Sequence, residues 1–171
     1  MLRRQDNPAT VPQLGRYEID PGGSTLTFRT RHLFGLAPVR GAFAIRTGTI
    51  DVAEPLADSA VHAEIEAASF HTGNGQRDRA VRSARFLDAG RHPLITFRSE
   101  GIDQSVLTGA LTVCGVTRPV RLAVEAADVS PRSFTARATT RIDRTEFGVT
   151  ALRGLAGRYL DLSLEVRCAR R

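Results

Sequence analysis

The sequence predicts an all-β protein in which about eight antiparallel strands follow one another along the chain. Apolar and polar residues alternate with a period of two through most of the sequence after residue 16. Short segments rich in Gly, Pro, Asp and Asn separate the alternating runs, and only one stretch changes to helical spacing. Regularly spaced antiparallel strands are typical of a β-sandwich or an up-and-down barrel, and this pattern leaves both open.

Length and composition indicate one domain with a distinctive charge. The chain has 171 residues, a formal net charge of +6, and no lysine, so arginine supplies every basic side chain. We expect a flexible leader over residues 1–15, which are polar and contain proline, and a single domain over residues 16–171. The charge favours acidic partners, but the arginines are scattered without an aromatic-interleaved motif, so no nucleic-acid partner is predicted.

The sequence predicts a cytoplasmic protein. Its N-terminal residues have no apolar run of signal-peptide length, and no stretch approaches a membrane span. The two cysteines fit a reducing compartment. By strand parity Cys114 and Cys168 point to different sides of the sheet, so we expect no disulfide between them. Two thiols and four widely spaced histidines also predict no metal site.

The first half of the domain is predicted to contain three strand regions and one loop. Residues 24–32 form a strand whose inward side chains are Leu26, Phe28, Thr30 and His32. Residues 33–38 (LFGLAP) are expected to form a loop with exposed apolar side chains. Residues 39–52 predict a bent strand or a strand pair, with bends at its glycines. Residues 61–67 then alternate apolar and charged side chains as a further strand.

One short helix is predicted at the rim, over residues 76–87. Ala80, Val81, Ala84 and Leu87 recur at helical spacing, and the stretch contains neither Gly nor Pro. It follows a Gly-Asn-Gly loop and ends before Gly90. Within it, Asp78 is expected to stabilise the helix N-terminus, whereas the fork of Arg77 suits a phosphate.

Strands resume at residue 94, where Ile95 and Phe97 point inward. The clearest element is the hairpin over residues 107–125 (LTGALTVCGVTRPVRLAVE), in which two alternating runs flank a turn at Gly115. Residues 134–142 and 159–167 are further strands, joined by an irregular or short helical crossing over residues 143–157. Small inward residues such as Gly109 and Ala138 should leave volume along the axis, because a packed core would fill these positions.

No catalytic constellation stands out in the sequence. The serines are not in a nucleophile-elbow context, and the histidines lack the spacing of metal ligands. His32 ends an apolar strand face, where it is either a surface histidine or a contact for a ligand headgroup. The inward phenylalanines are individually more typical of core residues than of ligand contacts.

Several ordered blocks of residues resemble the YceI-like family of polyisoprenoid-binding, lipocalin-like barrel proteins. The resemblance runs from about Tyr17 to Arg167 and includes the hairpin segment GALTVCGVTRPVRL. The remaining blocks are Tyr17, Ile19, Asp20, Ser24, Leu26, Phe28, Arg31 and His32; Val39, Arg40, Gly41 and Phe43; Ser69, Thr72, Arg77, Asp78, Phe86, Pro93, Ile95, Phe97 and Ser99; and Arg144, Glu146, Phe147 and Gly148. The chain departs from the family pattern at Tyr17, where Trp is usual, and at Ala80-Val81, where His-Leu is usual.

The resemblance implies a closed, eight-stranded antiparallel barrel around an apolar tunnel, without enzymatic activity. It implies a long isoprenoid ligand, such as a polyprenyl phosphate or the tail of a quinone, which the protein sequesters or carries, and no other cofactor. The sequence leaves a homodimer open. The expected ligand-binding residues are Phe28, His32, Phe43, Arg77, Asp78, Phe86, Phe97, Leu111, Ala138 and Phe147.

Two alternative functions remain at the level of sequence. One is a small-molecule enzyme that uses His32 and Asp78 as acid and base at the barrel mouth. The other is a nucleic-acid binder that acts through its surface arginines. For the lipid carrier, we also expect transient contact with anionic membranes through outward arginines, namely Arg29, Arg121, Arg137 and Arg141.

Overall fold

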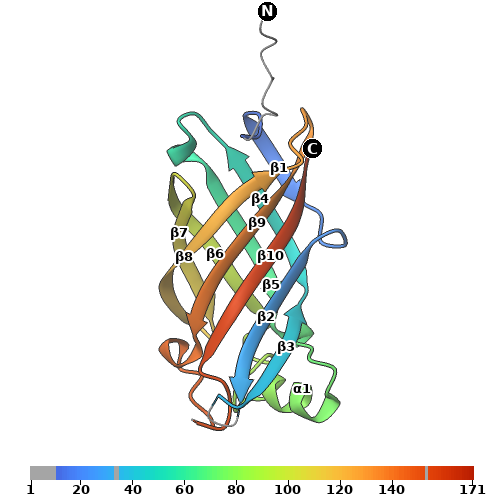
Figure 1. The fold of residues 1–171 in the computed structure, drawn as a ribbon, viewed down its shortest axis with the longest axis vertical. Helices are drawn as coiled ribbons and strands as arrows, with labels where there is room; N and C mark the ends of the chain where they lie inside the picture. The colour runs from blue at the N-terminus through green and yellow to red at the C-terminus, as the bar shows by residue number, and fades with distance from the viewer. Residues whose placement is uncertain (1–10, 33–34, 153) are drawn as a thin grey trace, which may run out of the picture.

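A computed structural model shows one closed antiparallel barrel capped by a short helix (Figure 1). It describes residues 11–32, 35–152 and 154–171, so most of the predicted leader and Leu33-Phe34 of the predicted loop lie outside the described residues. The strands are β1 (Gly15–Ile19), β2 (Thr25–His32), β3 (Ala37–Phe43), β4 (Ile45–Val52), β5 (Ala60–Glu66), β6 (Leu94–Asp103), β7 (Val106–Val113), β8 (Val116–Ala127), β9 (Ser133–Asp143) and β10 (Tyr159–Arg170). The helical elements are η1 (Leu56–Asp58), η2 (Ala67–Ser69), α1 (Gly75–Arg82) and η3 (Arg144–Phe147).

Strand β1 closes the barrel because it pairs with two neighbours at once. Tyr17 is opposite Ile50 of β4 on one side and Arg170 of β10 on the other. Strand β2 continues along the same edge of β10, and β3 and β4 are separated only at Ala44. Ten strand segments therefore fill eight positions around the ring, as predicted. Such a ring has no free strand edge where it is closed.

The alternation of inward and outward side chains that the sequence predicts is observed in the barrel wall. Leu26, Phe28 and Thr30 are buried, and the arginines between them are exposed. The same holds in β10, where Leu162 packs against the core and its neighbour Asp161 is paired with Arg141 on the outer surface. The inner face of the wall is consequently apolar over its whole height, which sets the character of everything that the barrel can hold.

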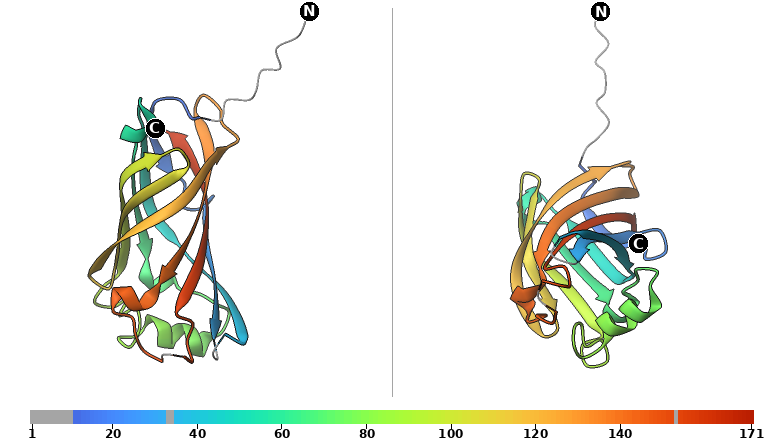
Figure 2. Two further views of the ribbon diagram at one scale, coloured as in Figure 1. Left: turned by 60° about the vertical axis from the view of Figure 1, so that its left-hand side comes forward. Right: turned by 60° about the horizontal axis from the view of Figure 1, so that its bottom comes forward.

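The segment between β5 and β6 closes one end of the barrel, here called the α1 end (Figure 2). At the bend after β3, Ala42 and His71 exchange two backbone hydrogen bonds of 2.8 and 3.0 Å. The Ser69 hydroxyl also accepts a 2.7 Å hydrogen bond from the backbone N–H of Ala44. These bonds fill the gap that opens where β3 diverges from β5, and they place α1 across the barrel mouth.

The helix is shorter than predicted. It spans Gly75–Arg82 instead of residues 76–87, and Asn74 caps it by accepting a 3.0 Å hydrogen bond from the Arg77 backbone N–H. Ser83 adopts an extended backbone conformation and its hydroxyl donates to the Ala80 carbonyl, which ends the helix. Residues 84–92 instead form turns that carry Leu87 into the core. Serine competes with helical hydrogen bonding in this way. None of the helices described here has the length and hydropathy to cross a bilayer.

Both cysteines are free, and they lie near opposite ends of the barrel. Cys168 of β10 is buried opposite Ile19, and burial raises the pKa of its thiol to about 12. Cys114 lies in the β7–β8 turn, where its thiol donates a 3.0 Å hydrogen bond to the Leu87 carbonyl. Burial and the nearby Asp88 carboxylate raise the pKa of Cys114 as well.

Two inward glycines make room for phenylalanine rings instead of opening the tunnel. A Cβ atom on Gly41 would lie 2.3 Å from Cζ of Phe28, its cross-strand partner. A Cβ atom on Gly109 would lie 2.6 Å from Cζ of Phe97 and 2.6 Å from the Arg98 carbonyl. The expectation that Gly109 leaves free volume is therefore wrong, because the Phe97 ring fills that space. Aromatic rings that cover strand glycines are a recurring device for fixing sheet register.

We expect Gly41→Ala to destabilise the barrel by about 1–3 kcal/mol, the usual cost of overpacking a core. The added methyl would meet both the Phe28 ring and the His71 carbonyl, which is backbone and is itself bonded to Ala42. Gly101→Ala is the matched control, since nothing lies within 4 Å of its new Cβ. Urea unfolding monitored by circular dichroism measures both variants. Equal stability of the two would contradict the close packing at Gly41.

Candidate functional site

The barrel interior contains two adjoining cavities along its axis. The one at the α1 end has a volume of about 400 Å³, and the one toward the opposite end has a volume of about 550 Å³. The same five side chains line both cavities and mark a waist between them, namely Leu26, Ile65, Leu111, Ile142 and Leu162. The two cavities therefore adjoin and together form one elongated, mainly apolar tunnel.

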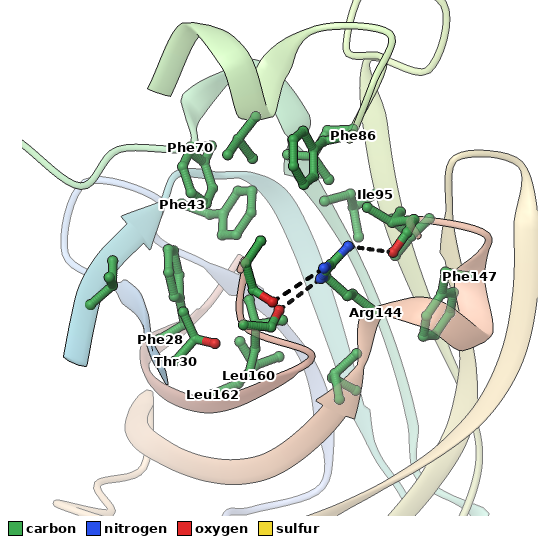
Figure 3. Close-up of a pocket in the computed structure, with 18 of the residues that line it drawn as sticks. Phe28, Thr30, Phe43, Phe70, Phe86, Ile95, Arg144, Phe147, Leu160 and Leu162 are labelled. Atoms are coloured by element: carbon green, nitrogen blue, oxygen red, sulfur yellow. Dashed lines mark hydrogen bonds between the residues drawn. The ribbon is translucent and has the colours of Figure 1, made fainter. Parts of the chain in front are cut away.

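Aromatic side chains line the cavity at the α1 end (Figure 3). The rings of Phe28 and Phe70 are stacked with centroids 5.2 Å apart, and Phe43 contacts both at 5.7 and 5.5 Å. Phe86 and Phe147 line the same cavity from the segment after α1 and from η3. Such rings provide apolar contact at little conformational cost, because each has only two rotatable side-chain bonds.

All of the predicted ligand-binding residues except Asp78 line the tunnel. Those at the α1 end are Phe28, His32, Phe43, Arg77, Phe86 and Phe147. Phe97 and Ala138 line the larger cavity, and Leu111 lies at the waist. Strand parity placed most of these residues correctly, because each inward position of a closed barrel wall faces the axis.

Asp78 lies outside both cavities and organises the loop before α1. Its carboxylate accepts hydrogen bonds of 3.0 and 3.1 Å from the Thr72 backbone N–H and a further one from the Thr72 hydroxyl. Nδ1 of His71 lies 3.5 Å from the same carboxylate. Burial alone would raise the pKa of Asp78, but the bonds from Thr72 and the charges of His71 and Arg82 outweigh it and lower this pKa.

This position of Asp78 adds to one expectation and corrects another. Asp78 is the acidic residue of the first turn of α1, as expected for a residue that stabilises the helix N-terminus, and it also braces the preceding loop. Of the proposed acid–base pair, only His32 lines a cavity, so the two side chains do not share a pocket. The enzyme hypothesis therefore lacks the arrangement on which it was based.

His32 presents a neutral imidazole to the tunnel. Its Nδ1 accepts a 2.7 Å hydrogen bond from the Gly157 backbone N–H, which leaves the ring proton on Nε2 in the neutral form. Burial lowers the pKa of His32, and the positive charges of Arg77 and Arg144 lower it further. The imidazole therefore offers one N–H donor to a mainly apolar cavity.

Arg77 supplies positive charge beside His32. Its side chain lines the α1-end cavity, and its Nε donates a 2.9 Å hydrogen bond to the Thr72 hydroxyl. Because Thr72 is itself bonded to Asp78, the loop and the first turn of α1 fix the direction of the Arg77 guanidinium. Arg77 and His32 thus place a cation and a neutral donor at the same end of the tunnel.

Arg144 is the functional-site residue that sequence reasoning did not select. It is buried and lines the cavity, where its Nε and one terminal nitrogen donate 2.7 Å hydrogen bonds to the carbonyls of Gly157 and Val149. The Phe86 ring lies 5.6 Å from the guanidinium carbon (Figure 3). Arg144 thus holds the 149–157 loop over the cavity. The signal that could have identified it is its place in one of the blocks that resemble the family, namely Arg144, Glu146, Phe147 and Gly148.

Phe70 was also missed, for a different reason. It follows η2 in an irregular segment, where neither strand nor helix periodicity indicates which side chains point inward. It is nevertheless buried against Phe28 and Phe43 in the cavity wall.

Comparison with known proteins agrees with this architecture. The family model described as the YceI-like domain matches residues 17–168, nearly the whole described barrel. The chain belongs to the YceI-like family. A UPF0312 protein of Vibrio parahaemolyticus is 28% identical over 167 residues, which cover 90% of this chain and 87% of that protein. Protein YceI of Escherichia coli O157:H7 is 38% identical over 114 residues, or 62% of this chain and 59% of that protein.

Two solved structures of low sequence identity share the YceI-like fold. Burkholderia cenocepacia BcnA superposes with a TM-score of 0.75 at 20% identity and covers 87% of this chain and 98% of its own. A polyisoprenoid binding domain from Saccharophagus degradans, implicated in plant cell wall breakdown, gives a TM-score of 0.74 at 14% identity and covers 93% and 100%. The predicted barrel class and the predicted family are therefore confirmed.

We expect moderate acidification to destabilise the protein through His32. Since the pKa of folded His32 is below its ordinary value of 6.5, the unfolded chain binds a proton first as pH falls. The stabilisation is complete above pH 6.5 and is lost as pH falls through the lowered pKa. Asp78 and Asp143 affect stability over a separate, more acidic pH range, because the ordinary pKa of both is 3.8 and the fold lowers it.

Thermal unfolding between pH 7.5 and pH 5 tests this expectation. The melting temperature of His32→Gln should fall less over this pH range than that of the unsubstituted protein. His62→Gln, on an outward position of β5, is the matched control and should follow the unsubstituted protein. An unchanged pH slope in His32→Gln would show that His32 does not titrate in this way.

Proposed function

We propose that this protein binds a long-chain isoprenoid lipid in its tunnel and sequesters or carries it. The observation that carries the proposal is the shape and chemistry of the interior, an elongated and mainly apolar tunnel with His32, Arg77 and Arg144 at its α1 end. A narrow tunnel fits a linear chain better than a compact ligand. The polyisoprenoid binding described for the Saccharophagus degradans domain supports the same ligand class.

The energetics favour exchange with a membrane over capture from water. Burying a chain of about forty carbons at roughly 0.8 kcal/mol per CH₂ would exceed the ceiling for non-covalent affinity. A cellular isoprenoid instead starts in a bilayer, where its chain is already out of water, so the apolar contributions nearly cancel. The fit of the tunnel and the contacts of the headgroup then decide whether the protein is loaded.

The polar end of the ligand belongs at the α1 end in this proposal. A headgroup there meets the Nε2–H of His32 and the charge of Arg77, so it needs at least one hydrogen-bond acceptor. A quinone carbonyl and a phosphate oxygen both meet that requirement. Arg77 favours the phosphate, because an ionised acceptor gains more from a guanidinium than a neutral one does.

The first prediction for this function concerns tunnel volume. Ala138→Phe should fold and lose most of its bound lipid, because Ala138 lines the larger cavity and a ring there would block it. The measurement is organic extraction of the purified protein followed by mass spectrometry, together with the thermal stability of the delipidated protein. Ala123→Phe, exposed on the outer face of β8, is the matched control and should keep its lipid.

Unchanged lipid content in Ala138→Phe would mean that Ala138 does not face the ligand. A loss of stability in the delipidated form by about 1–3 kcal/mol would instead indicate a packed core at this position.

The second prediction concerns the headgroup. Arg77→Ala should weaken binding of a polyprenyl phosphate and spare a neutral isoprenoid quinone, whereas His32→Ala should weaken both. Arg79→Ala is the matched control, since Arg79 is exposed on the same helix and does not line the cavity. Competition with a fluorescent isoprenoid measures the affinities. Equal losses of both ligands in Arg77→Ala would contradict charge recognition by this residue.

A further inference from the structure

Exposed apolar side chains surround the tunnel at the α1 end. Leu36, at the tip of the β2–β3 connection, is 83% exposed, and Leu152 and Leu155 are 40% and 46% exposed. Leu152 and Leu155 also line the cavity, so the same loop contacts both the tunnel and the solvent. The two connections are neighbours, because Gly157 donates to Nδ1 of His32 beside the start of the β2–β3 connection.

Basic residues accompany these leucines. Among the described residues of the two long connections at this end, 67–93 and 144–158, arginines outnumber carboxylates. The arginines are Arg77, Arg79, Arg82, Arg85, Arg91, Arg144 and Arg158, and the carboxylates are Asp78, Asp88 and Glu146. Arg79, Arg85, Arg91 and Arg158 are exposed, whereas Glu146 is the one exposed carboxylate among these residues. Arg91 and Arg158 lie 4.0 and 2.9 Å from the carboxylates of Asp88 and Asp143, so Arg79 and Arg85 contribute most of the positive charge at the surface.

The opposite end of the barrel also has exposed apolar residues, but its charge is mixed. Val11, Leu14 and Leu56 are 52%, 51% and 37% exposed. The described connections 20–24, 53–59 and 128–132 contain Asp20, Glu54, Asp58 and Asp128 against Arg132. Arg170 and Arg171 lie at the same end, where Arg170 donates to the Leu14 carbonyl. Apolar exposure alone therefore does not distinguish the two ends, whereas the charge balance is more basic at the α1 end.

We propose that the α1 end docks on anionic membrane surfaces, with Leu36, Leu152 and Leu155 inserted at the lipid interface. This inference rests on the proposed function, because it identifies where the lipid enters and leaves. Leucines that insert and arginines that face anionic headgroups are the two contributions that bind a peripheral protein to a bilayer. The mixed charge of the opposite end offers less attraction to the same surface.

This surface differs from the one that the sequence suggested. Of the wall arginines named there, Arg137 is paired with Glu165 at 3.2 Å and Arg141 with Asp161 at 2.8 Å. Their charges are balanced on the barrel wall, so they offer little attraction to a membrane. Leu152 and Leu155 of the α1 end, in contrast, are exposed and also line the α1-end cavity.

A unique tryptophan tests the docking surface, because the natural chain contains none. Leu36→Trp should show a blue-shifted emission on mixing with vesicles of phosphatidylglycerol and phosphatidylcholine. The shift should shrink with added salt and with pure phosphatidylcholine vesicles. Leu14→Trp places the same probe at an exposed position of the opposite end and should show no shift. A shift of both probes, or of neither, would overturn the proposal.

Vesicle flotation provides the second measurement. Leu36→Gln should partition onto the anionic vesicles roughly tenfold more weakly, the factor expected for losing a partly buried leucine side chain. Leu14→Gln should float as the unsubstituted protein does. A Leu36→Trp blue shift that grows with protein concentration in the absence of vesicles would overturn the proposal by showing a second copy of the chain on this surface.

Extraction of lipid from the same preparations separates this inference from the proposed function. Bound isoprenoid without any vesicle-dependent shift would reject the docking surface and leave the lipid-binding function intact. A vesicle-dependent shift in a protein that never holds isoprenoid would support the surface and reject the cargo. Leu36 does not line either cavity, so its substitution leaves the tunnel itself unchanged.

Discussion

The double pairing of β1 is the constraint on which the rest of the structure depends. One short strand joins β4 to β10, so the backbone N–H and C=O groups of the ring are satisfied within the wall. In a β-sandwich, packing across the core must hold two sheets together. Here the hydrogen-bonded ring maintains the shape, and the interior is free to remain partly unfilled. The tunnel is possible because closure, and not a packed centre, holds the wall in place.

Two sets of hydrogen bonds to backbone groups close the α1 end of the barrel. At the α1 end, bent β3 leaves a gap that is closed by backbone bonds between Ala42 and His71 and by the helix beyond them. Arg144 holds a second loop over the same opening through carbonyls of residues 149 and 157. Both sets of hydrogen bonds are made to backbone groups, and they act together with the apolar packing of Phe70, Leu87 and Val149. The polar residues of the tunnel are consequently the ones that also shape its entrance.

Strand parity predicted much of the fold, and tertiary contacts determined the rest. Leu26, Phe28 and Leu162 were placed correctly because a strand with one wet face has a strict period of two. Gly109 was misjudged, since its neighbour Phe97 fills its space from an adjacent strand and no local pattern records that contact. Asp78 was placed on the correct element, but the partner it binds, Thr72, lies in a loop without periodicity. Arg144 is an arginine in a late loop, and only the fold shows that it is buried.

The location of the closing strand has a consequence for how such a barrel can diverge. The β1–β4 and β1–β10 ladders involve residues 15–19, whereas the cavity loops at the α1 end involve residues 67–93 and 144–158. Changes in length or composition of those loops break none of the ladder bonds that close the ring. Selection can therefore reshape the ligand entrance while the folding of the wall is conserved, so related barrels can acquire different cargoes without first acquiring extra stability.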